Sequence, residues 1–218
     1  MGLPKGLPAL VSMFFVALLT AKTTEGCSCA LTHPQTQFCE ADFVMHVQVM
    51  DKTDTLDSRD TAYKVEMKKM FKVSNSSYQD LFKEYLYTSN LESTCGVSLH
   101  TGEEYVVSGQ IYDEKWRLSL CNIVMPWKKV TQRQRRGYEG LYAKSCACKV
   151  RYTRFKDKGK VLNRGGGKLC LWEDRPGPLE CQEKYGICML IDSRCSWKPS
   201  KPYDRCIRKH QSGRRQLH

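Results

Sequence analysis

Twelve cysteines, all of them after residue 26, are the feature that most constrains this 218-residue chain. An even number of cysteines in an exported chain is typical of a disulfide framework, because thiols oxidise outside the cytosol. A metal site built from Cys-x-Cys pairs is the alternative, but the cysteine spacings do not resemble those of a zinc ribbon. Spacing alone does not choose among the many pairings that twelve cysteines allow, so the disulfide partners stay open at this point.

The first 26 residues have the pattern of a secretory signal peptide. Lys5 supplies a positive charge, Leu7 to Leu19 form an apolar stretch, and Thr24-Glu25-Gly26 provides a cleavage site. The apolar stretch is short for a bilayer crossing, so an uncleaved anchor helix is the less favoured alternative. We expect residues 1–26 to be removed, and a secreted chain without a membrane span to begin at Cys27 in the extracellular space or matrix.

Alternation of apolar and polar residues predicts a mainly β fold. Asp42 to Met50 shows the alternation most clearly, and four more short strands are expected over residues 62–73, 82–88, 104–111 and 116–121. Asp51 to Asp60 and Ser74 to Asp80 are polar and rich in turn residues, so both are expected to be exposed loops. The second of these loops carries the sequon Asn75-Ser76-Ser77, a glycan acceptor site. A Thr-capped helix over residues 131–143 would close the small barrel or sandwich that five such strands form.

The composition changes after Cys146. Lys149 to Lys168 is basic and contains glycine, and the remainder is dense in cysteine and proline. We place a domain boundary in Cys146-Ala147-Cys148, between a domain over residues 27–146 and a smaller one over 147–218 that ends in a basic tail. The smaller segment buries little apolar surface by itself, so its disulfides are expected to supply much of its order.

No catalytic motif outweighs a structural interpretation of its residues. The chain has no His-Glu-x-x-His motif, and its five histidines are scattered, so it is not expected to be a zinc hydrolase. Gly165-Gly166-Gly167-Lys168 lacks the earlier glycine and the following Ser or Thr that a phosphate-binding loop requires. His33 precedes Pro34, and a structural role in a turn is expected for it. The sequence therefore predicts a protein that is not an enzyme and has no cofactor of its own.

The chain is basic, with a formal net charge of +12. For an exported protein the natural anionic partners are sulfated glycosaminoglycans and cell surfaces, not nucleic acid.

The expected mature chain begins Cys27-Ser28-Cys29-Ala30-Leu31-Thr32-His33-Pro34-Gln35. With this pattern directly after a signal peptide, the sequence resembles the tissue inhibitors of metalloproteinases. The resemblance is strong in the first domain, loose in the second, and includes Phe38-Cys39, Tyr63-Lys64-Val65-Glu66, Cys95-Gly96-Val97, Pro126-Trp127 and Cys170-Leu171-Trp172. It implies a five-stranded OB-type (netrin-like) barrel with flanking helices, followed by a small disulfide-rich C-terminal subdomain.

The resemblance also implies a disulfide pairing, matched by order and flanking residues: Cys27–Cys95, Cys29–Cys121, Cys39–Cys146, Cys148–Cys195 and Cys170–Cys188. Cys181 and Cys206 are left over, and we expect them to bridge each other. After Cys148 the chain lacks the closely spaced Cys-Pro-x-x-Pro-Cys pair of vertebrate members, so its C-terminal cysteine pattern looks like that of invertebrate members. Partners specific to the vertebrate C-terminal subdomain are therefore not carried over.

In the family, the first mature residue chelates the catalytic zinc of the target protease in trans, through its α-amino nitrogen and carbonyl oxygen. The resemblance implies this role for Cys27, with Ser28 pointing at the adjacent specificity pocket. The implied inhibitory ridge consists of Cys27, Ser28, Cys29, Ala30, Leu31, Glu92, Ser93, Thr94 and Cys95. Asp51 to Asp60 is expected to be an accessory contact.

The implied function is secreted inhibition of zinc metalloendopeptidases, the matrix metalloproteinases first and disintegrin-type metalloproteases second. The alternative is a non-inhibitory secreted netrin-like module that binds matrix polysaccharide or a receptor. Its binding face would consist of Lys149 to Lys168 with Lys128, Lys129, Arg133, Arg135 and Arg136. A third hypothesis, a thiol-redox enzyme, requires a free Cys-x-Cys pair.

Overall fold

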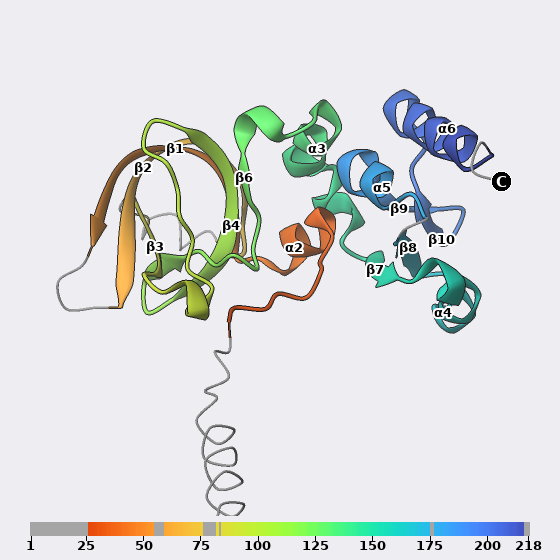
Figure 1. The fold of residues 1–218 in the computed structure, drawn as a ribbon. Helices are drawn as coiled ribbons and strands as arrows, with labels where there is room; N and C mark the ends of the chain where they lie inside the picture. Colours follow the sequence, from red (N-terminus) through yellow and green to blue (C-terminus); the bar gives the residue numbers. More distant parts are fainter. Residues whose placement is uncertain (1–25, 55–58, 76–81, 83, 175–176, 216–218) are drawn as a thin grey trace, which may run out of the picture.

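The computed structural model describes residues 26–54, 59–75, 82, 84–174 and 177–215. The expected signal peptide up to residue 25 and residues 76–80 of the sequon loop lie outside these ranges. Asn75 itself is exposed. Along the described chain, a β-barrel is followed by a smaller region of short sheets and helices that lies beside it (Figure 1).

The first part of the chain forms a closed five-stranded barrel (Figure 1). Its strands are β1 (Phe43–Asp54), β2 (Asp60–Val73), β3 (Tyr85–Ser89), β4 (Glu104–Tyr112) and β5 (Lys115–Arg117). They pair in the order β1-β2-β3-β5-β4, and β4 returns to β1 to close the ring. A further strand, β6 (Val124–Pro126), pairs with the start of β4. The expected mainly β fold with a five-stranded barrel is confirmed.

Strand β1 is buried on both of its faces where it begins, at Phe43, Val44 and Met45, which explains its central place in the fold. Phe43, Met45, Val47 and Val49 point into the barrel, as the alternation predicts, and the Phe43 ring lies 4.7 Å from the ring of Trp116. Val44 points the other way, into a second apolar cluster beneath the helices.

Short helices cover this outer face. They are α2 (Pro34–Glu40), η3 (Trp127–Lys129), α3 (Gln132–Arg136), the π-helical turn η4 (Gly137–Leu141) and η5 (Ala143–Ser145). The expected cap is confirmed, because the Thr131 hydroxyl accepts a hydrogen bond from the Gln134 backbone N–H, and the Gln134 side chain accepts one from the Thr131 N–H. The expected single helix is interrupted at Gly140, whose φ of 151° is not helical.

Three expectations about strand ends are wrong. Asp51–Asp54 were expected in a loop, but they continue β1 and pair with residues 61–64. This end of the hairpin extends beyond the part of β1 that pairs with β4, so exposed polar side chains are tolerated on it. The strand expected over residues 116–121 stops at Arg117, because the chain then turns toward the disulfide at Cys121. Strand β3 also begins later than expected, at Tyr85.

The second part consists of two two-stranded sheets and three α-helices around disulfides. Strand β7 (Lys149–Thr153) is parallel to β8 (Leu169–Glu173), and β9 (Cys188–Ile191) is antiparallel to β10 (Arg194–Trp197). The α-helices are α4 (Lys158–Arg164), α5 (Leu179–Tyr185) and α6 (Lys201–Arg215), and the 3-10 turn η6 (Phe155–Asp157) precedes α4. Its bridges are Cys148–Cys195, Cys170–Cys188 and Cys181–Cys206. None of the described helices combines the length and apolar composition that a bilayer crossing requires.

Gly109 is required for closure of the barrel. A Cβ atom there would lie 1.9 Å from the Arg117 carbonyl oxygen and 2.7 Å from the Phe43 ring. We predict that Gly109→Ala lowers the free energy of unfolding by about 3 kcal/mol, because backbone and ring must both shift. Gly159→Ala is the matched control, since a methyl group there meets open space on α4. Chemical denaturation of both variants checks this, and equal stabilities would contradict it.

Candidate functional site

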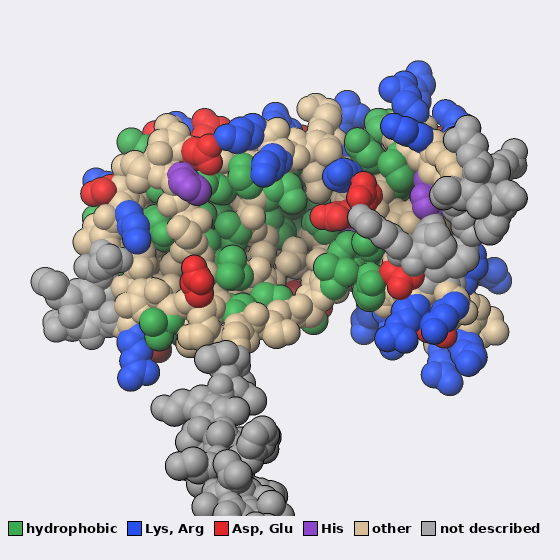
Figure 2. Space-filling model, in the orientation of Figure 1, with side chains coloured by type: hydrophobic (Ala, Val, Ile, Leu, Met, Phe, Trp, Pro, Cys, Tyr) green, Lys and Arg blue, Asp and Glu red, His purple; other side chains and the backbone are tan. Residues whose placement is uncertain are grey.

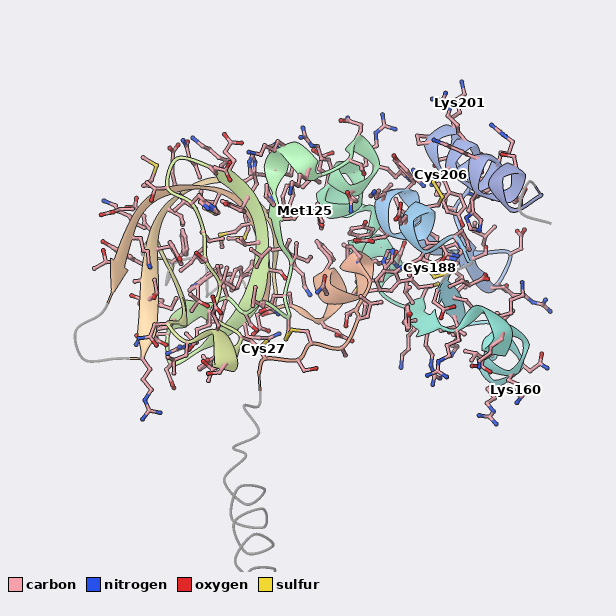
Figure 3. The ribbon with its side chains drawn as sticks, in the orientation of Figure 1. Cys27, Met125, Lys160, Cys188, Lys201 and Cys206 are labelled. Atoms are coloured by element: carbon pink, nitrogen blue, oxygen red, sulfur yellow. A yellow bond between two sulfur atoms is a disulfide. The ribbon has the colours of Figure 1, made fainter. Side chains whose placement is uncertain are left out.

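Two disulfides lie side by side at the start of the described chain (Figure 3). Cys27 is bonded to Cys95 and Cys29 to Cys121, with Cα–Cα distances of 5.0 and 5.2 Å. The Cys27 and Cys29 sulfur atoms are 3.8 Å apart, and so are those of Cys95 and Cys121. With Cys39–Cys146, Cys148–Cys195 and Cys170–Cys188, these are the five pairs that the resemblance implies. The bridge expected between the two remaining cysteines, Cys181 and Cys206, is also present, so no cysteine is free.

The four sulfur atoms are close enough to hold a metal ion, since all lie within 4.8 Å of one another. Zinc binds cysteine as the thiolate, however, and each of these sulfur atoms is already in a disulfide. Cys27 and Cys29 can therefore offer a metal only their backbone atoms.

The bridges present the first residues as an exposed but anchored segment. Ser28, Ala30 and Leu31 are all exposed, Leu31 to 54%. The Thr32 hydroxyl donates a hydrogen bond to the Ala30 carbonyl oxygen at 3.0 Å. Two covalent anchors within three residues therefore hold this exposed segment against the barrel.

The loop that carries Cys95 is a compact turn. It contains the 3-10 helix η2 (Glu92–Thr94), and the Thr94 hydroxyl bonds to both the Ser89 hydroxyl and the Leu91 carbonyl oxygen. Gly96 is needed behind it, because a Cβ atom there would lie 2.2 Å from the Ser89 carbonyl oxygen.

This loop and the N-terminal segment border one hollow. Its lining includes Cys27, Glu92 and Ser93, together with Lys52 of β1 and Leu120. The hairpin expected as an accessory contact therefore does reach the ridge, through the strand extension. The exposed segment from Ser28 to Leu31 runs outside the hollow.

Two apolar residues of this surface were missed by the sequence reasoning. Leu91 and Leu120 are 47% and 50% exposed, and the Leu120 N–H donates a hydrogen bond to the Cys95 carbonyl oxygen at 2.9 Å. The signal for Leu120 was its position next to Cys121, the implied partner of Cys29. No periodic pattern marks Leu91.

After the bridged residues Cys27 and Cys29, the His33 side chain bonds the chain to the second part of the molecule. Its Nδ1 accepts a hydrogen bond from the Gln35 N–H, so Nε2 carries the proton and donates to the Gln182 carbonyl oxygen at 3.0 Å. Burial of the ring lowers the pKa of His33 to about 4. The structural role expected for this histidine is confirmed, as the N-cap of α2.

Gln35 also bonds to the second part, through two hydrogen bonds to the Cys188 backbone. Its amide nitrogen donates to the Cys188 carbonyl oxygen at 2.8 Å, and its amide oxygen accepts from the Cys188 N–H at 2.9 Å. The side chains of His33 and Gln35 are both buried. The segment from His33 to Gln35 is therefore fixed to the second part of the molecule as well as to the barrel.

These features define a class: a β-barrel protein whose exposed segment at residues 27–31 is held to the barrel by two adjacent disulfides. Comparison with known proteins makes the assignment specific. The family model for tissue inhibitor of metalloproteinase matches residues 25–197. Metalloproteinase inhibitor 3 of Xenopus laevis is 36% identical, covering 81% of this chain and 83% of that protein. Tissue inhibitor of metalloproteinase of Drosophila melanogaster is 29% identical, covering 91% and 95%.

The chain belongs to the tissue inhibitor of metalloproteinase family. Members of this family are inhibitors and not enzymes, so the chain is a metalloproteinase inhibitor whose partners are metalloproteinases.

His33 should make stability depend on pH. Its pKa is about 4 in the fold against an ordinary value of 6.5, so the unfolded chain binds the proton more tightly. Above pH 6.5 the ring is neutral in both states and does not lower the free energy of unfolding. As the pH falls from 6.5 toward 4, this group lowers the free energy of unfolding by about 3 kcal/mol. His33→Gln should flatten this dependence in urea unfolding between pH 4 and 7. A His33→Gln curve as steep as that of the parent would contradict a buried neutral ring.

Proposed function

We propose that the protein is secreted, is cleaved after Gly26, and inhibits zinc metalloproteinases by placing the new N-terminus on the catalytic zinc. The α-amino nitrogen and carbonyl oxygen of Cys27 together form a chelate. An α-amino group has an ordinary pKa of about 8, so a fraction is neutral near pH 7 and can donate its lone pair. The zinc of such proteases has three protein ligands and one open position, which the chelate fills in place of water.

The single observation that carries this proposal is the pair of adjacent bridges at Cys27 and Cys29. A flexible terminus would lose conformational freedom on binding, and the bridges remove much of that cost beforehand. Because both sulfur atoms are in disulfides, Cys27 meets the metal through its backbone and not through a thiolate. No metal of the protein's own takes part, since the zinc belongs to the target.

The rest of the ridge has matching roles in this proposal. Ser28 points at the adjacent specificity pocket, and Ala30 and Leu31 continue along the protease cleft. Glu92, Ser93 and Thr94 make the second contact through the Cys27–Cys95 bridge. Matrix metalloproteinases are the first proposed targets and disintegrin-type proteases the second.

The remaining expectations stay proposals. Asn75 is a proposed glycan acceptor, which its exposure supports. Sulfated glycosaminoglycans are the proposed second class of partner, because the chain is strongly basic. Membership of the inhibitor family favours inhibition over the alternative of a non-inhibitory binding module.

One added residue should remove the inhibition. An extra alanine before mature Cys27 converts the amine into an amide, and we predict an apparent inhibition constant raised roughly a thousandfold or more. The control carries the extra alanine after His218. Stoichiometric titration of a matrix metalloproteinase measures the effect, and thermal unfolding verifies that both variants fold. Full inhibition by the N-terminally extended protein would refute the chelation mechanism.

Leu120 should be an apolar anchor of the ridge. We predict that Leu120→Ser weakens inhibition about tenfold, because a half-exposed leucine beside the chelating residue becomes buried in the complex. Leu190→Ser is the matched control, since Leu190 is 61% exposed on β9 and distant in sequence from the ridge. Equal inhibition constants for the two variants would show that Leu120 does not contact the protease.

A further inference from the structure

The net positive charge of the mature protein is confined to its second part. Residues 27–146 contain 15 Lys or Arg and 15 Asp or Glu, whereas residues 147–218 contain 18 Lys or Arg and only seven Asp or Glu. The barrel is therefore electrically balanced, and the smaller part carries the entire net charge. A solubility requirement alone gives no reason for such a division.

The cations of the barrel are also locally neutralised. Arg117 pairs with Asp60 at 2.8 Å, Lys69 with Glu139 at 3.2 Å, and Lys128 with Glu103. Arg135 lies over the Trp127 ring at 4.2 Å. The barrel residues that the sequence grouped with the basic stretch are thus partly engaged within the barrel.

In the second part, cations converge on the turn that precedes β8. The Lys149 N–H donates to the Lys168 carbonyl oxygen at 3.1 Å, and the Cys195 N–H donates to the Gly167 carbonyl oxygen at 2.6 Å. A Cβ atom on Gly167 would lie 3.5 Å from Cγ of Arg194. Lys168 therefore lies between β7, which carries Lys149, and β10, which carries Arg194.

At the start of β7 and of β10, exposed side chains flank a side chain that packs inward. Val150 on β7 and Cys195 on β10 pack into the disulfide core, so their neighbours Lys149, Arg151 and Arg194 point away from it. All three are exposed, as is Lys168, and no described acidic side chain forms an ion pair with any of the four. Helix α4 adds Lys160 and Arg164, one turn apart.

We propose that this basic surface, formed by Lys149, Arg151, Lys160, Arg164, Lys168 and Arg194, binds a sulfated polysaccharide. Figure 2 shows Lys and Arg side chains gathered over α4 and the adjoining strands. An isolated surface ion pair contributes little, so affinity requires a polymer that engages many cations at once. Six disulfides indicate an oxidising compartment outside the cytosol. A sulfated polysaccharide in that compartment is a polymer with many negative charges, so it can engage many cations at once. This inference rests on the proposed glycosaminoglycan partner and locates its binding surface.

The position of the surface has a functional consequence. The barrel end that carries Cys27 is separated from α4 along the molecule, as the labels of Cys27 and Lys160 show (Figure 3). The inhibitor should therefore block its protease while it is held on the polysaccharide.

The test compares two variants that each remove four positive charges. K149Q/R151Q/K168Q/R194Q alters the basic surface, and K201Q/R205Q/R208Q/K209Q alters the exposed face of α6, where Lys201 lies at the opposite end of the second part (Figure 3). We expect the first to weaken heparin binding about tenfold or more at about 0.15 M salt, and the second less than about threefold.

Each outcome of this experiment decides one point. Equal losses in the two variants would show that net charge and not this surface binds heparin. No heparin binding by the parent would refute a polysaccharide partner, and stronger binding to anionic lipid vesicles than to heparin would assign the surface to membranes. Titration of a metalloproteinase with heparin-bound inhibitor should give the same stoichiometry as with free inhibitor, and a loss of inhibition would refute the independence of the two surfaces.

Discussion

The covalent anchoring of residues 27 and 29 is the constraint on which the rest of the structure depends. Ordering a free chain costs about 1–2 kcal/mol per residue in backbone entropy. The bridges to Cys95 and Cys121 close sequence separations of 68 and 92 residues, so they join residues 27–29 to two loops that come from distant points in the barrel. The two bridges thus order residues 27–29, the turn around η2 and the chain after β5.

A second set of anchors extends this order across the molecule. His33 and Gln35 bond to Gln182 and Cys188 with their polar side-chain atoms, and all of these contacts are buried. The ridge is therefore held by disulfides on one side and by a buried hydrogen-bond network on the other. The two parts also differ in charge. The barrel, which carries the ridge, has equal numbers of acidic and basic residues, and the smaller part carries the net positive charge.

Local pattern was enough to predict much of the barrel. The alternation over residues 42–50 identified β1 and the side chains that fill the interior, and Thr131 marked a helix start. Polar strand residues such as Lys52 could not be recognised, because they lie on a hairpin extension that needs no apolar face. The short elements of the second part have too little periodicity to be predicted, since disulfides replace a large core there. Pairing of the cysteines required the family resemblance, and the exposed Leu91 had no sequence signal at all.

The most direct test of the central claim is a crystal structure of the mature protein bound to a metalloproteinase catalytic domain. The account predicts that the α-amino nitrogen and the carbonyl oxygen of Cys27 each lie about 2.0–2.2 Å from the zinc, with both bridges intact. A zinc ion that keeps its water, or that is bound by a cysteine sulfur at about 2.3 Å, would contradict it.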